Sequence, residues 1–529
     1  MLDCIVIGAG PGGLVCTKEL LEQGVPKIVC LEQSSSIGGV FANTYDDLML
    51  TSSATISMFS DFWIGDGEQH KFWTKEEALD YWQRYAQHFG VLDRIRFDSK
   101  VMSVAPHGEG WQVQLASGET LLTQRVALAV GNNAIPNYPD WKDLLTDVEY
   151  SHSKEYRNAD KFAGKNVVLV GGGESGSDVA LGVSRVASKS WVSLRNSTGW
   201  VAPRHRGEYA ADISTHRGVW GLPRDYGATL SKAICQAELS QNDPVHDAVV
   251  ELNKKIKARK GVWGTYGTKT FSLPKAIVHH GCKVVSGIVK VEDGGKTLHT
   301  ADGESLENVD AVVFSTGYKN FVSFLPESLQ ATDPRSLYKH MFHPKYRDKI
   351  VWIGSARPGF GSQFPIMEMQ SRLFAMICTG EKTLPIPAEM ERITCVDRAV
   401  YLEQFEHNAH RLRSLVDYHR YMDDIADSIG CKPPLWEYFF LHPRVWLRIV
   451  YGAIQSTQFR LRGPGNKESL AQDLLLKLPV SKMTHIVKSG LKGRLIYAFK
   501  NLIPKVSFFK FKDSQNSSSP SVVTRVPSV

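Results

Sequence analysis

Two glycine-rich turns, far apart in the chain, constrain the fold more than any other feature of the sequence. The turn GAGPGG follows the apolar run LDCIVI, and the turn GGGESG follows the apolar run NVVLV. Both have the spacing G-x-G-x-x-G, with the glycines Gly8, Gly10 and Gly13 in the first turn and Gly171, Gly173 and Gly176 in the second. A buried strand, such a turn and a helix form a unit that binds dinucleotides. The sequence therefore predicts two dinucleotide sites.

The first turn has all the parts of this unit. Gly8 permits the tight turn, Gly10 lets a pyrophosphate approach the backbone, and Gly13 lets the following helix pack closely on the strand. The helix-like stretch LVCTKELLEQG comes next, followed by a second strand, KIVCLE, which ends at Glu32. A carboxylate at this position can accept hydrogen bonds from a ribose diol. The first site is therefore expected to hold a dinucleotide with a free ribose.

The second turn differs at the position that corresponds to Glu32. The same distance along the chain from Gly171 leads to Arg195, at the end of the strand KSWVSLR. A guanidinium can pair with a 2′-phosphate, which a carboxylate would repel. The second site is therefore expected to prefer NADPH over NADH, and the first to hold FAD, as in flavoproteins that take hydride from a nicotinamide. The alternative is that Arg195 is a solvated surface residue.

Two further apolar strands end in glycine turns. They are RVALAVG, which ends at Gly131, and DAVVFSTG, which ends at Gly317. Strands of this kind often return the chain between two nucleotide domains. Their apolar residues are equally consistent with plain sheet core.

Several longer motifs give the sequence a specific resemblance. In chain order they are GAGPGGL, EQSSSIGGVF, FSDF at Phe59–Phe62, HSKEY at His152–Tyr156, GGGESGSD, FSTGY, RPGFGSQFPIMEMQSR, GCKP and QFRLRGPG. The chain resembles the flavin-containing monooxygenases, which are class B flavoprotein monooxygenases. The family fingerprint F-x-G-x-x-x-H-x-x-x-[FW] has His152 as its histidine and Tyr156 as its aromatic residue, but YPD at Tyr138–Asp140 replaces its F-x-G. We interpret His152 as a structural residue at the domain junction.

The resemblance also assigns roles near the flavin. The family sequence G-G-x-W is here Gly38 to Phe41, which keeps an aromatic ring, and Thr51 stands where the family usually has an asparagine. In the family that amide helps to hold the nicotinamide and the peroxide, so Thr51 is the predicted catalytic residue. Together with the two turns, the predicted cofactor-binding residues are Gly8, Gly10, Gly12, Gly13, Glu32, Gly39, Val40, Phe41, Thr51, Ser52, Gly131, Gly171, Gly173, Ser175, Gly176, Arg195, Gly317 and Gln370. No metal site is predicted.

The implied fold class is α/β, with two Rossmann-like dinucleotide-binding domains and a helical C-terminal region. The NADPH domain is expected to be inserted into the FAD domain. The predicted segments are residues 1–160 (FAD domain, first segment), 161–314 (NADPH domain with an insertion), 315–440 (FAD domain, second segment), 441–512 (helical and basic region) and 513–529 (disordered tail).

The resemblance implies an NADPH- and FAD-dependent monooxygenase that forms a flavin hydroperoxide and oxygenates an amine nitrogen or a sulfide. Three alternatives remain: an amino-acid N-hydroxylase that forms oximes, a Baeyer–Villiger monooxygenase and an uncoupled NADPH oxidase. A threonine hydroxyl is shorter than an amide and lacks its donor–acceptor pair, so hydrogen peroxide leakage is expected. The eight cysteines form no C-x-x-C pair, which argues against a disulfide reductase and indicates a reducing compartment.

The positive charge of the chain is concentrated near its C-terminus. Residues 481–512 contain eight Lys and Arg and no Asp or Glu among them, so the rest of the chain is nearly neutral despite its formal net charge of +7. These basic residues alternate with Ile, Leu, Tyr and Phe, which predicts either peripheral contact with an anionic membrane or docking on the protein body. Nucleic acid is not an expected partner. No membrane-spanning run is seen, and a cytoplasmic location is expected.

Overall fold

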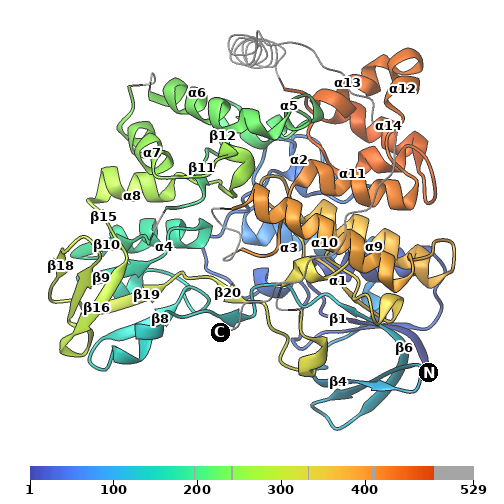
Figure 1. The fold of residues 1–529 in the computed structure, drawn as a ribbon, viewed down its shortest axis with the longest axis horizontal. Helices are drawn as coiled ribbons and strands as arrows, with labels where there is room; N and C mark the ends of the chain where they lie inside the picture. Colours follow the sequence, from blue (N-terminus) through green and yellow to red (C-terminus); the bar gives the residue numbers. More distant parts are fainter. Residues whose placement is uncertain (196, 240–241, 332, 407–411, 482–529) are drawn as a thin grey trace, which may run out of the picture. The chain divides into compact units, whose positions relative to one another are not determined.

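The computed structural model describes residues 1–481, except residues 196, 240–241, 332 and 407–411. The predicted disordered tail and all but the first residue of the basic segment lie outside the described residues. The described chain contains two large sheets, and each glycine-rich turn follows a strand of one of them (Figure 1). The predicted α/β class with two Rossmann-like units is therefore confirmed.

The first sheet has seven strands and begins at the N-terminus. Its order is β3-β2-β1-β6-β5-β4, and β21 also pairs with β6. The strands are β1 (Leu2–Ile7), β2 (Ile28–Leu31), β3 (Ile95–Arg96), β4 (Val101–His107), β5 (Gly110–Leu115), β6 (Thr120–Leu128) and β21 (Ile350–Trp352). β1 is parallel to β2 and β6, and β6 is parallel to β21, whereas β4 and β5 are antiparallel. The central strand β1 is buried on both faces from Cys4 to Ile7, which explains its uninterrupted apolar sequence.

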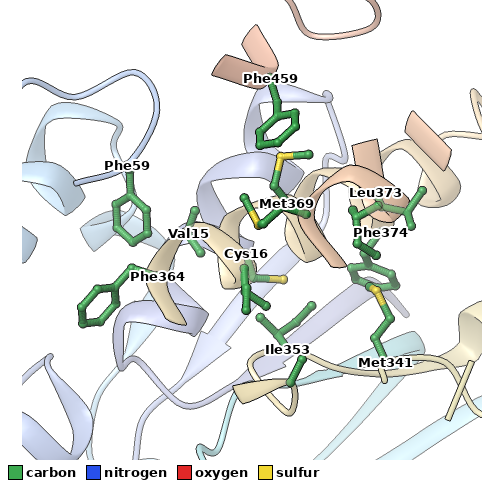
Figure 2. Packing of buried hydrophobic residues seen from close by; sticks show 14 of the residues in the cluster. Val15, Cys16, Phe59, Met341, Ile353, Phe364, Met369, Leu373, Phe374 and Phe459 are labelled. Carbon is green, nitrogen blue, oxygen red and sulfur yellow. The ribbon is translucent and has the colours of Figure 1, made fainter. Parts of the chain in front are cut away.

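Two helices that are far apart in the sequence pack together on this sheet. They are α1 (Pro11–Glu22), which follows the first glycine turn, and α9 (Gln363–Cys378). Figure 2 shows Val15 and Cys16 of α1 among Met369 and Phe374 of α9, with Ile353 beneath them, and all five side chains are buried in one cluster. Each such side chain stabilises the fold by about 1.5–3 kcal/mol. This cluster fixes the position of α1, and therefore of the first turn.

The second sheet has five strands, all parallel, in the order β15-β10-β9-β19-β8. They are β8 (Glu149–His152), β9 (Asn166–Val170), β10 (Lys189–Ser193), β15 (Lys283–Val285) and β19 (Ala311–Phe314). α4 (Glu174–Ser184) follows the second glycine turn, and α8 (Ser272–His280) packs against it. Because β8 pairs with β19, residues 149–152 lie in the second sheet, although the sequence placed them in the first segment of the FAD domain. The predicted domain boundaries themselves stay a prediction.

The two connections between the sheets run side by side. The chain leaves the first sheet after β6 through β7 (Ile135–Pro136), and it leaves the second sheet after β19 through β20 (Tyr318–Lys319). These two short strands pair antiparallel. The glycine turns at residues 131 and 317 therefore carry the chain from one sheet to the other.

The second sheet carries an insertion and a small antiparallel sheet. The insertion contains β11 (Trp200–Val201), β12 (His205–Arg206), β13 (Tyr209–Ala210), α5 (Arg217–Trp220), α6 (Gly227–Leu239), α7 (Pro244–Lys254) and β14 (Gly267–Thr268). The small sheet contains β16 (Ile288–Glu292), β17 (Thr297–Thr300) and β18 (Ser305–Leu306). The insertion is green in Figure 1, and its short 3-10 helix η5 (Ala211–Ser214) packs against α2 (Ala54–Ser57) near the N-terminus. The insertion therefore contacts the segment that follows Thr51.

The remaining elements complete the region around α9. They are α3 (Lys75–His88), α10 (Pro387–Gln404), α11 (Tyr418–Ile429), α12 (Leu435–Leu441), α13 (Pro443–Tyr451), α14 (Glu468–Lys477), β22 (Arg357–Pro358) and β23 (Leu415–Val416). α3 begins with a capping box, because the Thr74 hydroxyl accepts from the backbone of Glu77 and the Glu77 carboxylate accepts from that of Thr74. No helix in the described part of the chain combines the length and the apolar character that crossing a membrane requires.

Candidate functional site

The first glycine turn leaves no room for side chains at two positions. Gly8 has φ +101°, and a Cβ atom there would lie 2.7 Å from the carbonyl oxygen of Ala129. A Cβ atom at Gly13 would lie 1.7 Å from the carbonyl oxygen of Gly8. At Gly10 the nearest neighbour of such an atom is the Cα of Gly39, at 3.7 Å. Gly8 and Gly13 are therefore required for the turn itself, whereas Gly10 borders space that a ligand can occupy.

The N-terminus of α1 is suited to an anion. Its N-cap residue, Gly10, provides no side-chain cap for the first N–H groups. These groups carry partial positive charge and point out of the helix, so the pyrophosphate of a dinucleotide fits there. Gly12, which the sequence predicted as a cofactor contact, faces Met367 and Ile353. Its small size therefore supports helix packing.

Glu32 is fixed beside this turn at the end of β2. The side chain is 5% exposed, and one carboxylate oxygen accepts from the backbone of Ala9 at 2.7 Å. The other oxygen accepts from the backbone and the hydroxyl of Ser34, at 2.9 and 2.8 Å. A carboxylate has about four acceptor positions, so capacity remains for a ribose hydroxyl. Glu32 therefore has a structural role in addition to its predicted role.

The loop after β2 approaches the first turn. The short 3-10 helix η1 (Gly39–Phe41) begins beside Gly10, and Val40 is exposed. The ring of Phe41 lies 4.9 Å from Trp82 and 6.1 Å from Phe364, centroid to centroid. Phe41 therefore forms part of the apolar wall behind the loop.

The second turn repeats the geometry of the first. Gly171 has φ +106°, and a Cβ atom there would lie 2.5 Å from the carbonyl oxygen of Ser315. A Cβ atom at Gly176 would lie 2.3 Å from the carbonyl oxygen of Gly171, and one at Gly173 would meet nothing within 4 Å. Gly173 is the N-cap of α4 and provides no side-chain cap. A second pyrophosphate fits this N-terminus, beside the exposed Ser175.

Arg195 lies just beyond the end of β10 and is exposed. Among the described residues its guanidinium makes no hydrogen bond and no ion pair. A Cβ atom at Gly287 would lie 2.9 Å from the Cγ of Arg195, so the glycine leaves space for this side chain. The guanidinium is available for a 2′-phosphate.

Thr51 lies in a segment whose neighbours are firmly held. Its side chain is half-buried, and its hydroxyl makes no hydrogen bond within the described residues. The Ser52 hydroxyl is 2.8 Å from that of Ser57 and donates to that of Ser362 at 3.4 Å. Thr51 is therefore the residue of this segment whose hydroxyl is free for a ligand.

Two residues of the insertion hold the segment around Thr51, and the sequence reasoning missed both. The guanidinium of Arg204 donates to the carbonyl oxygens of Met49 and Leu50, at 3.2 and 3.3 Å. The carboxylate of Asp212 accepts from the backbone and the hydroxyl of Ser53, both at 2.7 Å. The sequence PRHRGEYAADIS contains no motif or periodic pattern that marks either residue.

Buried charges lie next to these contacts. Burial raises the pKa of Asp212, against the opposing effect of Lys269 and of the hydrogen bonds from Ser53. Burial lowers the pKa of Lys269, whose ammonium group donates to the carbonyl oxygen of Gly361 at 2.8 Å. The insertion therefore also contacts the loop that precedes α9.

Gln370 has a structural role that the sequence did not indicate. This side chain is fully buried, its oxygen accepts from the backbone of Gly354 at 2.8 Å, and its nitrogen donates to the Tyr421 hydroxyl at 2.6 Å. Gln370 therefore supports the turn after β21, and its contact with a cofactor stays a prediction.

The structural interpretation of His152 agrees with the structure. Its Nδ1 accepts from the backbone of Lys154, so Nε2 carries the proton and donates to the carbonyl oxygen of Gly317 at 3.1 Å. Burial lowers the pKa of His152. The ring therefore ties β8 to the turn that leaves the second sheet.

A cavity lies at the junction of the two connections. It is partly open to solvent, and its lining includes Gly131, Asn132, Lys319, Phe321 and Trp352. Gly131 and Gly317 both have positive φ, and a Cβ atom at either position would meet nothing within 4 Å. The glycine turn at residue 131 therefore borders open space, as its predicted role requires.

A buried network of charges secures α1. Glu19 of α1, Asp61 of the motif FSDF and Glu368 of α9 all pair with the guanidinium of Arg460. Lys18 of α1 also pairs with Asp61. Burial alone would raise the pKa of Asp61, but Arg460, Lys18 and Lys467 hold it well below its usual range. The acidic group Glu19, Glu22 and Asp61, the only candidate metal cluster among the described residues, is thus neutralised by the protein's own cations.

Comparison with known proteins identifies relatives over nearly the whole chain. The family model described as flavin-binding monooxygenase-like matches residues 3–509. A 4-hydroxybenzoate brominase (decarboxylating) from Pseudoalteromonas luteoviolacea (strain 2ta16) is 33% identical over 90% of this chain and 92% of its own length. Flavin-containing monooxygenase 5 from Rattus norvegicus is 29% identical over 95% of this chain and 97% of its own length.

Solved structures with the same fold are more distant in sequence. The S-allyl-L-cysteine S-oxygenase from Allium sativum has a TM-score of 0.59 at 18% identity, covering 94% of this chain and 98% of its own. The NADP⁺-bound cyclohexanone monooxygenase from Rhodococcus sp. Phi1 has a TM-score of 0.59 at 18% identity, covering 81% of this chain and 97% of its own. Both share the overall fold of this chain.

Proposed function

Because this chain belongs to the flavin-binding monooxygenase-like family, we propose that it is an NADPH-dependent monooxygenase that oxygenates a soft nucleophile of a small molecule. Membership of the family makes it an oxygenating flavoprotein with FAD and NADP as cofactors. The observation that carries the proposal is the pair of glycine turns. Each ends at a helix N-terminus that no side chain caps.

The roles of the protein's residues follow from their positions. The N–H groups at the start of α1 and α4 bind the two pyrophosphates. Glu32 accepts from the ribose hydroxyls at the first site, and Arg195 pairs with the 2′-phosphate at the second. The two cofactors, held by these residues, would supply the hydride transfer and the activation of oxygen. Thr51 offers one hydroxyl donor in the flavin-side segment. The protein therefore orients the reactants and excludes water.

The substrate class that we propose is an amine nitrogen or a sulfide. A soft nucleophile attacks an electrophilic oxygen without needing a strong acid or base nearby, and the protein contributes mainly positioning. NADPH consumption, measured across amines, thioethers, amino acids and ketones, with product and hydrogen peroxide quantified in parallel, tests the proposal. Amine or thioether oxygenation is expected. Turnover of ketones to esters would favour a Baeyer–Villiger enzyme. Formation of hydroxylamines or oximes from amino acids would favour an N-hydroxylase, and release of peroxide without product would favour an uncoupled oxidase.

A second candidate comes from the brominase relatives. Two brominases named for 4-hydroxybenzoate are 33% and 32% identical over 90% of this chain, more than the 29% of flavin-containing monooxygenase 5 from Rattus norvegicus. Bromide is also a soft nucleophile, so the same cofactors and the same protein residues would serve. Adding bromide and 4-hydroxybenzoate to the assay distinguishes the two candidates, because only halogenation gives a bromophenol.

We also propose peripheral contact with an anionic membrane through the C-terminal region. The basic segment of residues 481–512 motivates it, and α12 supports it. On α12, Trp436, Phe440 and Leu441 are 79%, 73% and 65% exposed. Exposed Trp, Phe and Leu on one helix are typical of helices that lie at a membrane interface.

Co-sedimentation with anionic liposomes tests this contact. A truncation after Pro479 and the variant Trp436→Ser/Phe440→Ser are expected to bind less than the parent. Ile386→Ser, which changes an equally exposed apolar residue elsewhere on the surface, serves as the control. Equal binding of all four proteins would contradict the membrane proposal.

A further inference from the structure

The segment Met49–Ser53 is held on both sides of Thr51 by a single stretch of the insertion. Before Thr51, the carbonyl oxygens of Met49 and Leu50 accept from Arg204. After Thr51, the backbone N–H and the hydroxyl of Ser53 donate to Asp212. The insertion therefore fixes this stretch of backbone from both directions. Between the two contacts lies the hydroxyl of Thr51, which bonds to none of the residues that the structure describes.

Asp212 is the stronger of the two contacts. Its carboxylate is buried, and both of its oxygens are 2.7 Å from a donor of the same residue, Ser53. Hydrogen bonds to an ionised carboxylate are about twice as strong as neutral ones. Two such bonds to one residue fix both its backbone and its side chain. By contrast, the Arg204 bonds are longer, at 3.2 and 3.3 Å.

The contact also connects the insertion of the second sheet with the segment that follows the first sheet's strand β2. Asp212 belongs to the insertion of the second sheet, and Ser53 precedes the motif FSDF on the flavin side. Next to Asp212, Lys269 of the same insertion donates to Gly361, in the loop that leads into α9. The insertion thus holds two flavin-side loops at once.

We propose that Asp212 is a positioning residue that sets the geometry of Thr51 and thereby determines how much of the NADPH consumed ends as hydrogen peroxide. The inference rests on the proposed function, because it assigns a specific support to the predicted catalytic residue. Asp212 itself touches neither substrate nor cofactor in this assignment. It acts through Ser53 and the backbone of the segment.

The matched control is another hydrogen bond between the same two parts of the protein. The Tyr45 hydroxyl donates to Asp178 of α4 at 3.0 Å. Tyr45→Phe removes this bond and leaves both hydrogen bonds between Ser53 and Asp212 in place. It therefore separates a general loosening of the two parts from the specific loss of support at Thr51.

Two measurements on Asp212→Ala, Asp212→Asn and Tyr45→Phe test the inference. Amide hydrogen exchange in peptides covering residues 50–54, without NADPH, is expected to accelerate about tenfold in Asp212→Ala, since Ser53 loses its acceptor. Asp212→Asn keeps one acceptor and is expected to give a smaller acceleration, and Tyr45→Phe none. The peroxide released per NADPH should follow the same order, while the FAD content stays at the parent level.

The inference is overturned if exchange at residues 50–54 is unchanged in both Asp212 variants, or if Tyr45→Phe raises exchange and peroxide release as much as they do. It is also overturned if exchange accelerates but the peroxide share does not change. A parent protein that consumes no NADPH would contradict the proposed function. The exchange measurement would still decide whether Asp212 holds the segment.

Discussion

The first and the second glycine turn have nearly the same backbone geometry, but their surroundings differ. In each, two glycines are required because a Cβ atom would strike a backbone carbonyl, whereas a Cβ atom on the middle glycine would meet no other atom closer than 3.7 Å. The residue that is expected to contact the ribose differs, however. Glu32 is buried and bonded to the turn itself, whereas Arg195 is exposed and its guanidinium bonds to none of the described residues.

This difference separates two ways in which a protein can select a nucleotide. A buried carboxylate that accepts from Ala9 and Ser34 contributes to the fold and to binding together. An exposed guanidinium is expected to contribute to nucleotide binding alone, by pairing with a phosphate. We therefore expect the first site to be part of the stable structure, and the second to be adjustable without cost to folding.

The largest expected effect comes from filling the space in front of each helix. Gly10→Val should abolish FAD binding and Gly173→Val should weaken NADPH binding by more than about tenfold, because the added side chain occupies the position of the pyrophosphate. Flavin absorbance of the purified proteins and nicotinamide titration measure the two effects. Gly173→Val should remain yellow, and a yellow Gly10→Val would contradict the assignment of the first site.

Removing the guanidinium should change cofactor choice without changing folding. Arg195→Ala is expected to reduce the preference for NADPH over NADH by about 1–3 kcal/mol, the worth of hydrogen bonds to charged groups. Steady-state kinetics with both nucleotides measure the preference. If the variant discriminates as well as the parent does, another residue contacts the 2′-phosphate.

Removing the carboxylate of Glu32 should lower the stability of the protein even without a cofactor. Glu32→Ala leaves the N–H of Ala9 without its acceptor, so the free energy of unfolding of FAD-free protein should fall by about 1–3 kcal/mol. Arg195→Ala should change it by less than about 0.5 kcal/mol. Denaturant titrations of both variants test the contrast, and equal stabilities would remove the distinction between the two sites.

The smallest expected effect concerns Thr51, which lies between the two sites in the proposed mechanism. Thr51→Asn restores the amide that the family usually has, with a donor and an acceptor in place of one hydroxyl. Hydrogen peroxide released per NADPH should fall by about twofold to tenfold, the range of one hydrogen bond. An unchanged or higher peroxide share would show that Thr51 does not limit coupling.

Much of the fold could be predicted because its signals are local. The family, the α/β class and the two cofactors are confirmed, and each followed from short stretches such as LDCIVIGAGPGG. No residue pattern shows which sheet β8 joins, because the four residues EYSH look the same in either sheet, and only its pairing with β19 assigns it to the second. The internal bonds of Gln370 were hidden for a related reason. Its motif is typical of the family, but a motif does not reveal that both ends of the amide are bonded inside the protein.

The sequence by itself determined the two units that are predicted to bind nucleotides, because a strand, a glycine turn and a helix are adjacent in the chain and need no distant partner to form. It also determined the difference between the two sites, because Glu32 and Arg195 stand at fixed distances from their turns. Only the tertiary structure decided what surrounds Thr51. Asp212 and Ser53 are separated by 159 positions, and a contact between residues so far apart depends on how the whole chain packs, which no local pattern of residues records.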